Sequence, residues 1–210
     1  SLHSIELPHS WYTFSSDYGT NRFVIEHVDC IGMHSDHNVA NYNNGTYTCI
    51  IPNGNYTANE LVNTINEVLE RDFAITINAN GLPIRLIYNP NTNKIQFQIN
   101  WQFFNNHPAV REPTTNTQFI NIKFYGPEFN STCSNGGGGK IDYNLGWLMG
   151  FRKKEYKIVA VPEYPYNNTV MESITGESLV DTYGSRYVLL YVDEYINNRV
   201  TQGLISLTNN

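Results

Sequence analysis

The chain of 210 residues has few charged side chains and no long apolar run. Asp, Glu, Lys and Arg make up 15% of it, against roughly a quarter in average domains. Acidic residues outnumber basic ones by 19 to 13 and the formal net charge is −6, so we expect no surface that binds nucleic acid directly through its phosphates. Because no stretch of about 18 apolar residues occurs, we also expect no membrane span.

Cysteine is scarce as well. The three cysteines are Cys30, Cys49 and Cys133, an odd number without a C-x-x-C spacing. Neither a disulfide framework nor a zinc knuckle is therefore indicated, and a reducing compartment is the simplest setting. We expect no cofactor.

Asparagine and aromatic residues are abundant instead, with 29 Asn, 15 Tyr and 10 Phe. Asn favours turns, whereas Tyr and Phe favour strands. Runs typical of strands recur along the whole chain, each bounded by Gly, Pro, Asn or Asp. They cover residues 11–14, 22–28, 46–51, 74–77, 84–88, 94–99, 119–124, 156–161 and 187–193.

The clearest β pattern lies at residues 84–99, where a Pro-containing turn at 89–93 precedes a strictly alternating segment. Such alternation predicts a half-buried antiparallel strand, and the turn predicts a hairpin. By contrast, residues 187–193 lack alternation and are typical of a central strand buried on both faces. The alternating residues are Ile95, Phe97 and Ile99 on one face and Gln96 and Gln98 on the other.

One segment, about residues 57–72, predicts an amphipathic helix. Thr57 and Glu60 have the spacing of a capping box, and four apolar residues then recur at helical spacing, so this stripe must be buried. Because strands do not alternate with helices elsewhere, we predict a mainly β, antiparallel two-sheet sandwich with this helix in a crossover, forming a single domain over 1–210. The apolar residues are Leu61, Ile65, Val68 and Leu69.

The search for catalytic motifs returns none. Residues 136–140, GGGGK, lack the earlier Gly and the following Ser or Thr of a phosphate-binding loop. Residues 176–180, GESLV, lack the second Gly of a nucleophile elbow. We therefore predict no catalytic residues and no enzyme, although a serine and a histidine brought together by the fold stay possible on sequence alone.

Metal-ligating side chains are concentrated in residues 26–37. Imidazole and carboxylate are plausible ligands for a transition metal, but successive residues of a strand point to opposite faces, so only some could converge. We favour a polar loop after a strand, and metal binding is the alternative. The four candidate ligands are His27, His34, Asp36 and His37.

Five segments, in their order along the chain, resemble virion structural proteins of large nucleocytoplasmic double-stranded DNA viruses. Specificity comes from this order, since each segment alone is loose. The segments are 3–12 (HSIELPHSWY), 18–23 (YGTNRF), 51–57 (IPNGNYT) leading into the helix, 144–151 (NLGWLMGF) and 185–195 (SRYVLLYVDEY).

The resemblance implies a minor capsid or penton-type protein with a jelly-roll sandwich, located in the virion and assembled in the host cytoplasm. It implies a homo-oligomer that also contacts other capsid proteins, and it transfers no catalytic residue. The pattern in such proteins often continues past the point where this chain stops, which leaves open that the chain is a fragment.

Aromatic residues in the irregular stretches are candidate contact residues, because exposed apolar patches usually mark partner surfaces. The alternative function is a carbohydrate-binding or virion-associated hydrolase module, whose exposed Tyr and Trp would stack on a glycan. The interface candidates are Trp101, Phe103, Phe104, Tyr125, Phe129, Tyr164 and Tyr166.

Overall fold

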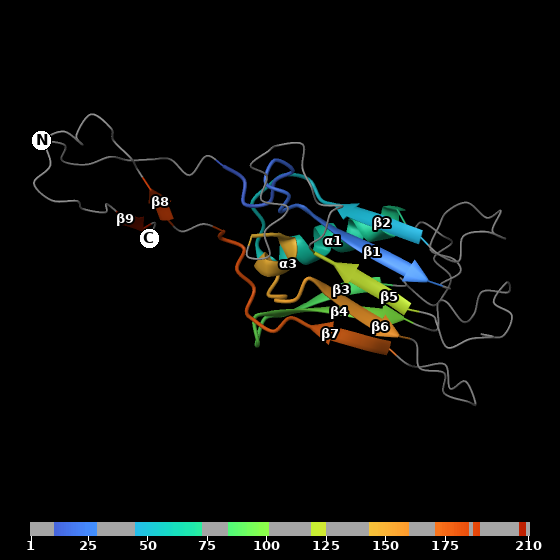
Figure 1. Ribbon diagram of the computed structural model, residues 1–210. Coiled ribbons are helices and arrows are strands. Elements are labelled where there is room, and N and C mark those ends of the chain that lie inside the picture. Colours follow the sequence, from blue (N-terminus) through green and yellow to red (C-terminus); the bar gives the residue numbers. More distant parts are fainter. Residues whose placement is uncertain are drawn as a thin grey trace, which may run out of the picture.

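The computed structural model describes residues 11–28, 45–72, 84–100, 119–124, 143–159, 171–184, 187–189 and 206–208. Two antiparallel sheets dominate these residues, one with the strand order β2-β1-β5-β6 and one with the order β3-β4-β7 (Figure 1). The mainly β, antiparallel prediction is confirmed, and the arrangement is consistent with a sandwich. The strands are β1 (Arg22–Val28), β2 (Gly45–Ile50), β3 (Ile84–Asn89), β4 (Lys94–Asn100), β5 (Phe119–Lys123), β6 (Glu155–Val159) and β7 (Met171–Thr175).

The predicted hairpin forms from β3 and β4, with Ile84 opposite Ile99 and Asn89 opposite Lys94. The three apolar residues of β4 are buried and its two glutamines are half-buried, as the alternation predicts. The Asn89 side chain accepts a hydrogen bond from the backbone N–H of Asn91 at 3.0 Å. Asn93 completes the turn at φ 49°, a conformation that asparagine tolerates better than most residues.

The predicted helix is α1 (Ala58–Asp72), and it lies against β3 and β2. Its capping box forms: the Thr57 N–H donates to Glu60 Oε2 at 2.8 Å, and the Glu60 N–H donates to Thr57 Oγ1 at 3.3 Å. At the other end the Tyr47 hydroxyl of β2 donates to Asp72 Oδ2 at 2.6 Å. The four predicted apolar residues are buried, together with Val62.

Asn66, in the middle of α1, closes the outer edge of β3 at Leu86. Its amide nitrogen donates to the Leu86 carbonyl at 2.9 Å, and its amide oxygen accepts from the Leu86 N–H at 2.8 Å. A side-chain amide thus makes the pair of bonds that a further strand would make. Because an open strand edge invites unwanted pairing, we infer that this contact protects the edge as well as positioning the helix.

The core between the sheets is a stack of aromatic rings contributed by both. Phe97 of β4 contacts Phe23 of β1 and Phe151, with ring centroids 5.6 and 5.3 Å apart. Phe124, which follows β5, stacks on Phe151 at 5.3 Å, and Tyr156 of β6 meets the Phe151 ring edge-on at 5.2 Å. Such pairs contribute beyond the area they bury, so these rings fasten the two sheets together.

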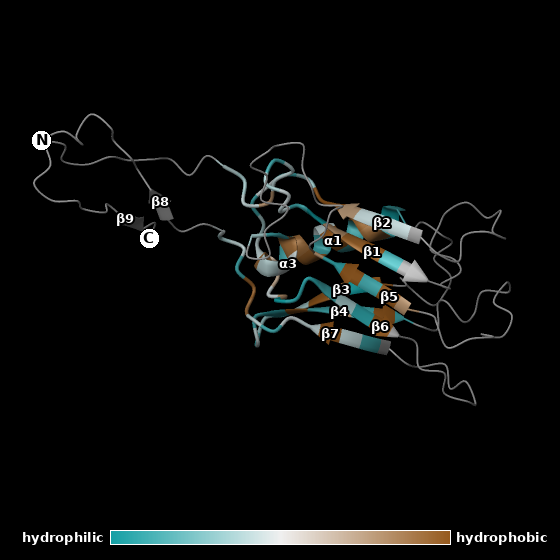
Figure 2. Cartoon of the chain, viewed as in Figure 1, coloured by the Kyte–Doolittle hydropathy of each residue, from teal (hydrophilic) through white to brown (hydrophobic). Residues whose placement is uncertain are grey.

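A one-turn helix not predicted from the sequence, α3 (Leu145–Leu148), packs on this stack and carries hydrophobic colours in Figure 2. The Asn144 side chain caps it by accepting the Trp147 N–H at 2.8 Å. A Cβ at Gly146 would lie 2.2 Å from the Phe124 ring, so only glycine fits there. Gly150, at φ 96°, turns the chain after α3, which brings its carbonyl to the Ser178 N–H at 2.9 Å.

Three other strand predictions fare differently. Residues 11–14 form only an isolated bridge between Phe14 and Gly54, and residues 74–77 lie outside the described residues. Of the segment expected to be a central strand, the described residues form β8 (Tyr187–Leu189), which pairs with β9 (Ser206–Thr208) in a sheet separate from the other two (Figure 1). Absence of alternation suggests that both faces are covered, but it does not identify the neighbouring strand.

Candidate functional site

The structure describes the side chain of none of the residues proposed from the sequence as interface residues or metal ligands. The backbone of His27 lies on β1 opposite Gly45 and Ile120, but its side chain is not described. The other candidates lie outside the described residues. These are the metal candidates His34, Asp36 and His37 and the interface candidates Trp101, Phe103, Phe104, Tyr125, Phe129, Tyr164 and Tyr166.

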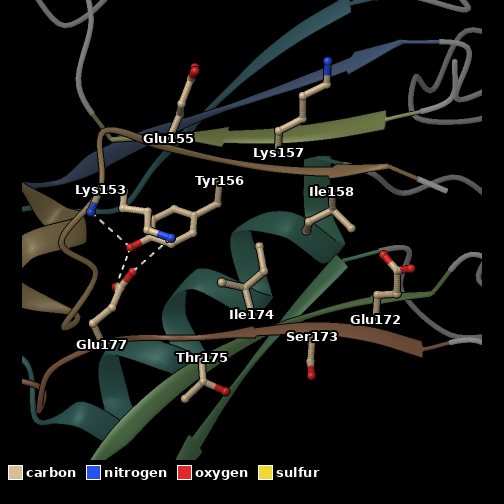
Figure 3. A pocket seen from close by; sticks show the side chains of 10 residues that line it. All are labelled: Lys153, Glu155, Tyr156, Lys157, Ile158, Glu172, Ser173, Ile174, Thr175 and Glu177. Carbon is tan, nitrogen blue, oxygen red and sulfur yellow. Dashed lines mark hydrogen bonds and ion pairs between the residues drawn. The ribbon is translucent and has the colours of Figure 1, made fainter. Parts of the chain in front are cut away.

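In the described part of the chain, a groove of about 600 Å³ lies between β6 and β7. These strands are the end strands of different sheets, so the groove runs along the side of the molecule where the two sheets end. Tyr156, Ile158 and Ile174 point into it (Figure 3). The lining residues are Lys153, Glu155, Tyr156, Lys157, Ile158, Glu172, Ser173, Ile174, Thr175 and Glu177.

One end of the groove is closed by hydrogen bonds around Tyr156. Its hydroxyl donates to Glu177 Oε2 at 2.5 Å and accepts the backbone N–H groups of Arg152 and Lys153 at 3.0 and 3.1 Å. Glu177 Oε2 also accepts the Arg152 N–H at 3.1 Å, and the Lys153 ammonium lies 3.9 Å from Glu177 Oε1 (Figure 3). The segment after α3 is thereby fixed to the end of β7.

The pKa values of the two titratable groups that meet at this end are shifted in opposite directions. Burial, with the hydrogen bond to Glu177, raises the pKa of Tyr156 to about 12. Burial also pushes the pKa of Glu177 up, but the hydrogen bonds from Tyr156 and the Arg152 N–H, with the Lys153 charge, outweigh it and hold that pKa below its ordinary value. Neither group titrates near pH 7, where a general acid or base works best.

On the other side of β6 a row of polar side chains crosses the outer face of the four-stranded sheet. The Lys123 ammonium lies 2.9 Å from Glu26 Oε2, and its hydrogen bond holds the pKa of Glu26 below the ordinary value. The Asn121 amide donates to Glu26 at 3.3 Å and to Glu155 at 2.9 Å. Lys157 lies over the Phe119 ring, 3.8 Å from its centroid. The row therefore ends in opposite charges, Glu155 and Lys157, on the end strand.

Among the described residues, no strand pairs with the outer side of β6. The Phe124 N–H donates to the Lys154 carbonyl at 2.9 Å, and alternate residues of an antiparallel strand bond to the same neighbour. From the register of β5 with β6, Tyr156 and Ile158 therefore bond to β5, whereas Glu155 and Lys157 direct their N–H and C=O groups away from the sheet.

The same reasoning applies to β7. The Gly176 N–H donates to the Ile95 carbonyl at 2.9 Å, so the register with β4 turns the backbone groups of Ser173 and Thr175 outward. The groove is thus flanked by two end strands. Within the described part of the fold, their outward N–H and C=O groups face no neighbouring strand.

Sequence reasoning missed this groove, and it also missed the apolar side chains that the described surface exposes. Tyr183 is the most exposed, at 78%. They lie in loops or on the outer side of β2, and no spacing distinguishes them from core aromatics. They are Tyr12, Tyr18, Ile50, Leu179 and Tyr183.

Within the described ranges no three His, Cys, Asp or Glu residues lie close enough to hold a metal ion, and no described helix has the length and apolar character needed to cross a membrane. A scan against protein-family models and a search of curated proteins find no match to this chain.

Proposed function

We propose that this protein is a structural subunit of a virion, of the minor capsid or penton type, with its two sheets arranged as a jelly roll. It acts through association with copies of itself and through contacts with neighbouring capsid proteins, within particles assembled in the host cytoplasm. The proposal assigns it no enzymatic activity.

The observation that supports the proposal best is the open side of the fold at β6 and β7. Proteins that work alone usually protect their strand edges, and here Asn66 protects the edge of β3. The ends of both sheets at the groove have no comparable cover among the described residues, and the groove contains apolar side chains. Such a surface suits a subunit whose partner completes it.

A second candidate function, glycan binding, is favoured by the exposed tyrosines. Tyr12, Tyr18 and Tyr183 are each about half exposed or more, and such rings can stack on the apolar face of a sugar. This candidate would make the protein a carbohydrate-binding module or part of a virion-associated hydrolase.

Sedimentation velocity over a wide range of protein concentration, together with a glycan-array screen, separates the two candidates. Reversible oligomers without glycan binding are expected for a structural subunit. A protein that stays monomeric at every concentration and binds a glycan would overturn the proposal in favour of the second candidate. Antibody labelling of intact particles from the source virus would then test location, with surface or vertex labelling expected.

A further inference from the structure

We propose that two copies of this chain associate through β6, edge to edge and antiparallel, about a two-fold axis that passes by Tyr156. The pairing joins the two four-stranded sheets into one continuous sheet. This inference rests on the proposed function, because it names the surface and the partner through which the subunit would self-associate.

The backbone of β6 allows this pairing because every second residue directs both its N–H and its C=O group to the outer side of the strand. Glu155 and Lys157 direct their N–H and C=O groups away from β5, as derived above. A second β6 running antiparallel can accept and donate bonds only at the same alternate residues. The two-fold registers centred on either of these charged residues, or on the residue between them, are therefore those at Glu155, Lys157 and Tyr156.

Charge selects among these three registers. A two-fold axis at Glu155 places Glu155 opposite its own copy, and an axis at Lys157 does the same for the lysine. An axis at Tyr156 places Glu155 opposite Lys157 of the second copy, and the symmetry repeats the pair. Opposite charges directly across two strands are stabilising and like charges are destabilising, so only the register at Tyr156 is favourable.

The side chains that would meet in this pairing lie on the outer face of the sheet. Glu155 and Lys157 both point to that face and away from the groove (Figure 3). The polar row reaches the edge at Glu155 through the Asn121 amide, and Lys157 lies over the Phe119 ring of the neighbouring strand. In the pair, the row would continue onto the second copy without interruption. Each copy carries a formal charge of −6, so the two local Glu–Lys pairs also offset a general repulsion between copies.

The edge of β7 offers no such selection. Its outward residues are Ser173 and Thr175, and a two-fold pairing of β7 would place uncharged side chains opposite each other. Strand β7 carries no basic residue, so no register of β7 is favoured by a pair of opposite charges. This difference is why the inference commits to β6.

Two charge reversals and their mixture test the pairing. The Glu155→Lys variant presents only lysines across the axis, and the Lys157→Glu variant presents only glutamates. Because the axis repeats each pair, each variant replaces two attractive pairs by two repulsive ones, and we expect its dissociation constant to rise by about tenfold or more. In an equimolar mixture every lysine faces a glutamate, so association should return.

Sedimentation velocity measures all three samples, with one component fluorescently labelled in the mixture. The doubly exchanged variant, with Lys at 155 and Glu at 157, should associate like the wild-type protein. Glu67→Lys, on the exposed face of α1, is the matched control for net charge and should leave association unchanged. If Glu155→Lys fails to fold, Glu155→Gln keeps an oxygen that can accept the Asn121 amide and should still weaken association.

The outcomes separate this inference from the function on which it rests. A wild-type protein that associates with unchanged affinity in both single variants would overturn the pairing at β6 and leave self-association intact. A mixture that stays monomeric, although the single variants are folded, would also overturn it. A wild-type protein that is monomeric at every concentration would overturn both the pairing and the self-association in the proposed function.

Discussion

Replacing Asn66 by alanine should destabilise the protein by an amount that the geometry allows us to estimate. The change removes two hydrogen bonds to the Leu86 peptide, each worth about 1 kcal/mol net and more when a buried group is left without a partner. Leu86 is buried, so water replaces the amide poorly. Alanine returns at most about 0.7 kcal/mol through its better helix propensity. The expected loss is about 1.5 to 3 kcal/mol in the free energy of unfolding.

Urea unfolding followed by circular dichroism measures this loss. With an m-value of about 2 kcal/mol/M, the midpoint should fall by about 1 M. Asn63→Ala is the control, because Asn63 is exposed on the same helix and should lose nothing. Asn66→Asp should be as damaging as alanine at neutral pH, since a carboxylate cannot donate to the Leu86 carbonyl, and should recover partly in acid. Equal stability of the Asn66→Ala and Asn63→Ala variants would refute the edge-protecting role.

Two further predictions concern the core. Gly146→Ala places a methyl group 2.2 Å from the Phe124 ring, so we expect a loss of about 1 to 3 kcal/mol from overpacking; a calorimetric melting temperature equal to that of the wild type would contradict the stated geometry. Burial raises the pKa of the Cys49 thiol from 9.0 to about 12, so its contribution to stability is complete below pH 9 and is lost as the pH rises toward 12. In a variant whose other two cysteines are serine, Cys49 should react with a thiol reagent at pH 8 only after urea unfolding, and prompt reaction in the native protein would show that the site is open.

Sequence pattern identified the parts of the fold whose signal is local. The hairpin of β3 and β4 was predictable because alternation reports one buried face, and α1 was predictable because its capping box and apolar stripe coincide. Strand β7 was not, since Glu172, Ser173 and Thr175 leave it with little apolar content. The structure supplies the reason: β7 is an end strand beside a groove, so part of it is in contact with water.

The candidate site depended on information that the sequence does not contain. Aromatic content directed attention to irregular stretches, whereas the groove forms where end strands of two different sheets come together. Tyr156 and Glu177 are 21 positions apart, and no motif connects them. The opposite charges of Glu155 and Lys157 are visible in the sequence, but their meaning depends on knowing that β6 is an end strand with its backbone directed outward.

The aromatic stack makes the two sheets unfold together. Its rings are drawn from β1, β4 and β6 and from the segments that follow β5 and α3, so neither sheet keeps a complete hydrophobic face once the other leaves. If one sheet unfolded alone, these rings would be exposed to water. The free energy of that partial unfolding would be close to the free energy of unfolding the whole protein. Amide protons of β4 and β5 should therefore exchange with deuterium through the same global opening, at matching free energies.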